Sequence, residues 1–96
     1  MHQTLTKEQK EILFSAILKL KNLEECHAFF DDVCTINELM AMAQRFEIAK
    51  LLYDGATFHE VENDTGASST TISRVSRCLK YGQGYTTVLK RQEDSV

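Results

Sequence analysis

The residues best suited to chemistry form a hydroxyl-rich run that follows Gly66. Residues 67–77 read Ala-Ser-Ser-Thr-Thr-Ile-Ser-Arg-Val-Ser-Arg. Residues 65–92 contain five Lys or Arg side chains and no Asp or Glu, whereas residues 1–64 carry 6 basic and 12 acidic side chains. Short hydroxyl side chains let a helix approach base edges closely, and arginine bridges the acceptors of guanine. A basic segment in an otherwise acidic chain therefore predicts a localised anionic partner such as double-stranded DNA.

A helix-turn-helix is the element that would position this run. It needs a short helix, a tight turn and a second helix held across the first by apolar contacts. Gly66 is placed to make the turn, and Val61 precedes it on the inner face. Ile72, Val75 and Leu79 recur at the spacing of an inner stripe on the second helix. The pattern predicts a helix-turn-helix with its hydroxyl and arginine side facing outward.

The predicted helix-turn-helix spans residues 57–80, and its candidate DNA contacts lie mostly on the second helix. Ser69, Thr70, Ser73 and Arg77 point away from the apolar stripe at about 100° per residue. Free amides at the start of that helix can also meet a phosphate. The full candidate set is Ser68, Ser69, Thr70, Thr71, Ser73, Arg77 and Lys80, together with His59. The alternative is a surface helix without a ligand, which would more often carry Glu and Lys.

Capping signals and glycines predict an all-α chain with almost no strand signal. Four Asn or Thr residues each precede a Glu or Gln by three positions, the spacing of a capping box. Gly55 and Gly66 are placed to end two helices in the left-handed conformation. The expected helices cover approximately residues 7–21, 23–33, 36–54, 58–65, 69–81 and 85–92.

The first expected helix carries more apolar surface than a small monomer can cover. Its apolar residues from Ile12 to Leu23 span an arc of roughly 240°, whereas a helix on one small core needs an arc of little more than about 100°. Phe29 and Phe30 add to this surface. We therefore expect residues 1–34 to form a homodimer interface. The alternative is a monomer in which the first helix is deeply buried.

The chain resembles the Trp repressor superfamily, and more closely its Trp-repressor-like branch in bacteria. The resemblance is strongest over residues 35–82, in Thr35-Ile-Asn-Glu, in Gln44-Arg-Phe-Glu-Ile-Ala-Lys-Leu-Leu and in Gly66-Ala-Ser-Ser-Thr-Thr-Ile-Ser-Arg. It implies a six-helix fold, an intertwined homodimer, and a transcriptional repressor that binds palindromic operator DNA.

The same resemblance identifies an effector pocket and two departures from it. Arg45 and Arg74 match the two arginines that sandwich the indole of tryptophan in the repressor. Val75 stands where the repressor has a glycine that leaves room for the ring, and Cys78 replaces a serine. We therefore expect no cofactor and no response to tryptophan, with an ion pair to a nearby acid as the alternative role of the arginines. Glu62 also departs from the family, which has a lysine that approaches phosphate there.

Length and composition indicate one globular domain over residues 1–96, with 43% apolar residues, 26% charged residues and a net charge of −3. These values exclude a disordered chain and a collagen-like repeat. No apolar run approaches the roughly 18 residues of a membrane span, and no signal-peptide pattern opens the chain. We expect a cytoplasmic protein without a membrane partner.

The remaining polar residues show no pattern of an active site or a metal site. The three cysteines are odd in number and lack the spacing of a four-ligand zinc site, so we expect reduced thiols. No nucleophile motif or phosphate loop is present, and we expect no enzymatic activity. The alternative function is a protein-interaction module that docks on another regulator or on RNA polymerase.

Overall fold

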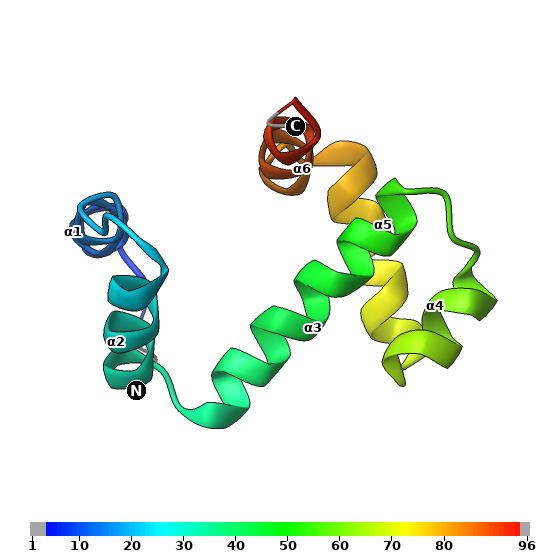
Figure 1. The fold of residues 1–96 in the computed structure, drawn as a ribbon, viewed down its shortest axis with the longest axis horizontal. Coiled ribbons are helices and arrows are strands. Elements are labelled where there is room, and N and C mark those ends of the chain that lie inside the picture. Colours follow the sequence, from blue (N-terminus) through cyan, green and yellow to red (C-terminus); the bar gives the residue numbers. More distant parts are fainter. Residues whose placement is uncertain (1–3, 95–96) are drawn as a thin grey trace. The chain divides into compact units, whose positions relative to one another are not determined.

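The computed structural model describes residues 4–94, which form α-helices and no strand. The helices are α1 (Lys7–Ile17), α2 (Leu23–Val33), α3 (Ile36–Tyr53), α4 (Phe58–Thr65), α5 (Ser69–Tyr81) and α6 (Gly84–Asp94) (Figure 1). The predicted all-α class with six helices is confirmed within this range. Internal contacts divide the chain into two units, of which the first ends at Thr35 and the second begins at Ile36.

Reciprocal caps explain where two of the helices begin. The hydroxyl of Thr6 accepts from the backbone N–H of Gln9 at 3.0 Å, and the Gln9 side chain accepts from the N–H of Thr6 at 3.0 Å. Thr57 and Glu60 repeat this arrangement at the start of α4, at 3.1 and 3.0 Å. Asn22 caps α2 through its own side chain. These bonds satisfy backbone donors that a helix start otherwise leaves free.

The first unit consists of α1 and α2 and contains no buried side chain in either helix. α1 ends at Ile17 rather than near residue 21 as expected. The N–H groups of Lys19 and Leu20 bond to carbonyls only three residues back, so the chain leaves the α-helix in tight turns. Ile12 and Leu18 are 66% and 84% exposed. The homodimer interface expected over residues 1–34 and its monomeric alternative both stay predictions.

The core of the second unit lies where α3, α4, α5 and α6 meet. α3 packs against each of the other three helices, and α5 also packs against α4 and α6. Among residues 4–94 the buried side chains are all apolar and come from these helices and the α4–α5 turn: Ile48, Ala49, Val61, Ala67, Ile72, Val75 and Leu89. Burial of these side chains fixes the position of α5 relative to its neighbours.

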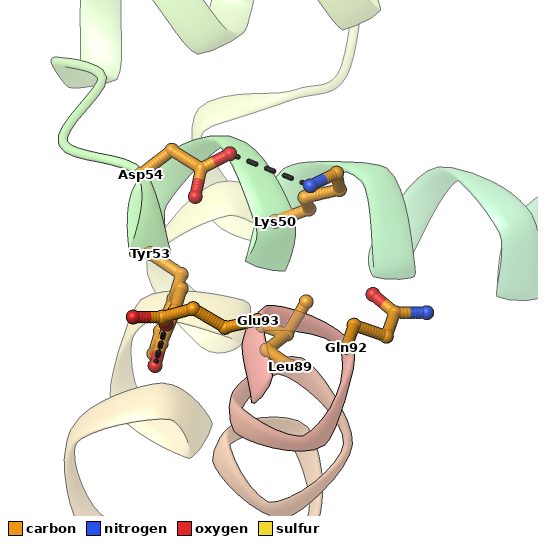
Figure 2. A pocket seen from close by; sticks show the side chains of 6 residues that line it. All are labelled: Lys50, Tyr53, Asp54, Leu89, Gln92 and Glu93. Carbon is orange, nitrogen blue, oxygen red and sulfur yellow. Dashed lines mark hydrogen bonds and ion pairs between the residues drawn. The ribbon is translucent and has the colours of Figure 1, made fainter. Parts of the chain in front are cut away.

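One hydrogen bond joins the end of α6 to the end of α3 (Figure 2). The Tyr53 hydroxyl donates to Oε2 of Glu93 at 2.8 Å, and Glu93 raises the pKa of the Tyr53 phenol by accepting this bond. On the other side of the same small cavity, of about 260 Å³, Lys50 Nζ lies 3.5 Å from Oδ2 of Asp54. Leu89 contributes to the lining of this cavity. Since α6 also packs on α5, this junction helps to fix the position of α5.

Candidate nucleic-acid interface

The turn between α4 and α5 has the geometry that the helix-turn-helix requires. Gly66 ends α4 in the left-handed conformation, with φ 68° and ψ 10°, and its N–H donates to the carbonyl of Glu62 at 2.9 Å. The Thr65 hydroxyl donates to the carbonyl of Val61 at 2.7 Å and accepts from the N–H of Ala67 at 3.2 Å. Glycine adopts this φ without the steric cost that other residues meet. The turn therefore sets the direction in which α5 leaves.

α5 buries its apolar stripe and exposes its polar side. Ile72 and Val75 are 0% and 1% exposed, and Leu79 is half-buried against them. The predicted inner stripe is thus confirmed. The exposed side chains on the rest of the helix are Ser69, Thr70, Ser73, Arg74, Arg77, Cys78, Lys80 and Tyr81. The predicted outward direction of the hydroxyl and arginine side is confirmed, while its contact with DNA stays a prediction.

Two of the predicted DNA contacts serve the helix cap. The Ser68 hydroxyl accepts from the N–H of Thr71 at 3.2 Å and donates to the Thr71 hydroxyl at 3.1 Å. Thr71 is half-buried, unlike its neighbours Ser69 and Thr70. Ser68 and Thr71 therefore help to position the exposed hydroxyls as well as adding to the polar start of α5. His59 lies on α4, is exposed, and has its Nε2 3.3 Å from Nδ2 of Asn63.

The cations of α5 are not neutralised by neighbouring acids. Within residues 4–94, Arg74, Arg77 and Lys80 have no carboxylate oxygen at ion-pair distance. No acidic residue lies in the first turn of α5, so its N-terminal amides and the helix dipole add positive potential there. The exposed side of α5 therefore offers hydroxyls, guanidinium groups and an ammonium group to an anionic partner.

Arg45 and Arg74 face a common pocket in the structure. The pocket has a volume of about 400 Å³ and is lined by Arg45, Thr70, Thr71 and Arg74. In the part of the chain that the structure describes, neither arginine pairs with a carboxylate, so the ion-pair alternative is not found. The two threonines were not predicted to line this pocket. Their spacing of four and three residues before Arg74 was the available signal.

Val75 does not occupy the space between the two arginines. We expected its isopropyl group to fill part of the pocket, but the side chain lies in the core and is absent from the pocket lining. That expectation about Val75 was wrong because a residue 60° away from Ile72 around the helix faces inward with it. Cys78 is exposed and likewise does not line the pocket.

A comparison with known protein families places this fold. A sequence profile of the Trp repressor protein matches residues 8–93. The chain belongs to the Trp repressor family. An uncharacterized protein of Bacillus subtilis strain 168, YerC, is 55% identical over 84 residues, which cover 86% of this chain and 81% of YerC. The resemblance seen in the sequence is thus confirmed.

Solved structures of Trp-repressor-like proteins share this fold. One is a crystal structure of a candidate Trp repressor from Staphylococcus aureus, with 45% identity, a TM-score of 0.86, and coverage of 92% of this chain and 89% of that one. Another is a TrpR-like protein from Eubacterium eligens, with 49% identity, a TM-score of 0.84, and coverage of 92% and 91%. The family consists of transcription regulators that bind DNA and are typically dimeric.

Between residues 4 and 94, no helix has the length and hydropathy needed to cross a bilayer. The same residues contain no group of three or more His, Cys, Asp or Glu side chains arranged to hold a metal ion.

Proposed function

We propose that this protein is a sequence-specific transcription regulator that binds palindromic operator DNA as a homodimer and represses transcription. The observation that carries the proposal is the orientation of α5, which buries Ile72 and Val75 and turns its hydroxyl and arginine side to solvent. Membership of the Trp repressor family supports the same function. The proposed partner, chromosomal DNA, implies a cytoplasmic location.

The proposed base contacts come from the outward side of α5. The N-terminal residues of a recognition helix contact base edges in the major groove, which assigns this role to Ser69, Thr70 and Ser73. Arg77 is one turn further along and is assigned to the acceptors of a guanine. Lys80, and His59 on α4, are assigned to phosphates, which fix the register without reading the sequence.

The proposed homodimer would cover the apolar surface of α1 and α2. Within the unit formed by α1 and α2, Ile12, Leu18 and Leu23 are 66%, 84% and 78% exposed. Monomeric proteins rarely leave this much apolar surface in water. A second copy is the favoured occupant because a two-fold dimer presents two α5 helices to the two halves of a palindrome.

A selection from random duplex DNA tests this function. We expect the wild-type protein to enrich a palindrome whose half-sites lie about one helical turn, or roughly 34 Å, apart. The double variant T70A/S73A should lose preference for the site, whereas Thr87→Ala, which removes an exposed hydroxyl from α6, should keep it. Failure of the wild-type protein to enrich any sequence would refute the proposal.

For the Arg45–Arg74 pocket we propose that tryptophan is not the effector. This chain differs from the tryptophan-responsive repressor on the turn of α5 that carries Arg74, where Val75 and Cys78 replace a glycine and a serine. Wild-type protein should therefore give no saturable heat of binding when it is titrated with tryptophan.

A second candidate function is a protein-interaction module that docks on another regulator or on RNA polymerase. The exposed carboxylate of Glu62 on α4 favours it, because a first helix that rests on a DNA backbone is better served by a cation. The selection experiment separates the two functions. Absence of an enriched site, together with a protein that co-purifies at fixed stoichiometry, would support the second.

A further inference from the structure

α4 and α5 carry opposite charges that remain separate although the helices touch. Val61 of α4 and Ile72 of α5 share one core, and the two helices pack against each other. In residues 4–94 no ion pair joins them. The acids of α4 are Glu60, Glu62 and Asp64, and the cations of α5 are Arg74, Arg77 and Lys80.

The three acids of α4 do not have the same role. Glu60 accepts from the N–H of Thr57 in the capping box, and this bond lowers the pKa of its carboxyl group. Glu62 and Asp64 are exposed, and neither makes a side-chain hydrogen bond or an ion pair with a described residue. The capping bond therefore explains why an acid stands at position 60. It gives no reason for the carboxylates of Glu62 and Asp64.

Glu62 and Asp64 lie on opposite flanks of α4. Measured from the buried Val61 at about 100° per residue, Glu62 is turned by about 100° one way and Asp64 by about 60° the other way. Whichever flank of α4 faces a duplex therefore presents a carboxylate.

These carboxylates lie within electrostatic range of DNA that contacts α5. Packed helices have axes about 8–10 Å apart, and the Debye length at physiological salt is about 8 Å. A phosphate backbone drawn to the cations of α5 is therefore repelled by α4, partly screened at physiological salt and more strongly felt at low salt.

Building on the proposed function, we propose that Glu62 and Asp64 act as an electrostatic brake on DNA binding. They weaken the affinity for every duplex to the same degree, because phosphate repulsion does not depend on base sequence. Stable binding then requires the base contacts of α5, and the protein spends little time on unrelated DNA.

The test compares two double variants that remove the same charge from different places. E62Q/D64N removes both carboxylates from α4, whereas E47Q/D94N removes two exposed carboxylates from α3 and α6. Fluorescence anisotropy gives the Kd of each full-length protein for the selected palindrome and for a scrambled duplex, at low and at physiological salt. Circular dichroism melts verify that both variants fold.

We expect the E62Q/D64N dimer to bind both duplexes roughly tenfold more tightly than the wild-type dimer. The ratio of the Kd values for the two duplexes should not change. The gain in affinity should be smaller at higher salt. Each single variant should show part of this gain, and E47Q/D94N should bind like wild type.

Three results would overturn the brake. No gain for E62Q/D64N, or an equal gain for E47Q/D94N, would reject it while leaving the proposed function intact. A change confined to the palindrome would mean that the carboxylates read bases, for example a cytosine amino group, and would also reject it. Wild-type protein that binds neither duplex would overturn the proposed function and the brake together.

Discussion

Truncation of Val75 to alanine tests whether its side chain packs in the core or fills the effector pocket. Val75 is 1% exposed and packs in the cluster that contains Ile72. Val75→Ala removes two carbon atoms from this site, which costs about 1.6 kcal/mol at about 0.8 kcal/mol per carbon. The cavity left behind raises the loss of unfolding free energy to about 2–3 kcal/mol.

Thermal and urea unfolding, each measured with and without tryptophan, check this value. At roughly 4–8 °C per kcal/mol for a domain of this size, the Tm of Val75→Ala should fall by about 10 °C or more. Val88→Ala is the matched control, since Val88 is 45% exposed on α6 and should cost much less. Tryptophan should leave the Tm of all three proteins unchanged.

The opposite pattern would refute the reasoning. If Val75→Ala keeps the stability of the wild type and gains a Tm that rises with tryptophan concentration, the Val75 side chain lies in the pocket between Arg45 and Arg74 rather than in the core.

Three further predictions concern DNA contact, assembly and acid stability. Arg77→Ala should weaken operator binding by about 1–3 kcal/mol and relax the preference at one base pair, measured by anisotropy on single-base variants of the site, with Thr87→Ala as control. A similar loss on all sequences would assign Arg77 to a phosphate instead. Leu18→Glu should yield monomers in sedimentation equilibrium, whereas Lys19→Glu should not; if Leu18→Glu stays dimeric, the proposed interface is wrong. Glu60 has a lowered pKa in the folded protein, so its contribution to stability is present above the unfolded pKa and is lost as pH falls through the folded value. In urea unfolding the wild type should therefore lose stability relative to Glu60→Gln as pH falls, and parallel pH profiles would contradict this.

The elements of the second unit follow from short-range signals in the sequence. The capping box at Thr57 and Glu60 and the left-handed Gly66 are local features, and the structure contains both. The apolar spacing of α5 is also local, so its buried stripe could be predicted before any contact was known. These features were sufficient to predict that the outer side of α5 is exposed.

Other features depend on which of several adjacent groups makes a given contact, and these could not be predicted in the same way. The apolar run after Ile17 continues the helical pattern, yet α1 ends there because the chain turns toward α2. Ser68 and Thr71 are of residue types that contact DNA, but here they hydrogen-bond to each other in the cap of α5. Residue type alone does not show which of several adjacent hydroxyls the backbone will use.

Val75 shows how two arguments from one sequence can conflict. Its spacing assigns it to the inner stripe of α5, whereas family resemblance assigns the same position to the space of a ligand ring. One side chain cannot point both ways, and its burial with Ile72 decides for the core. Two residues that are neighbours in a motif therefore need not face the same pocket, because successive side chains of a helix point in different directions. Arg45 and Arg74 are the more informative residues, because both line the pocket and neither pairs with a carboxylate among residues 4–94.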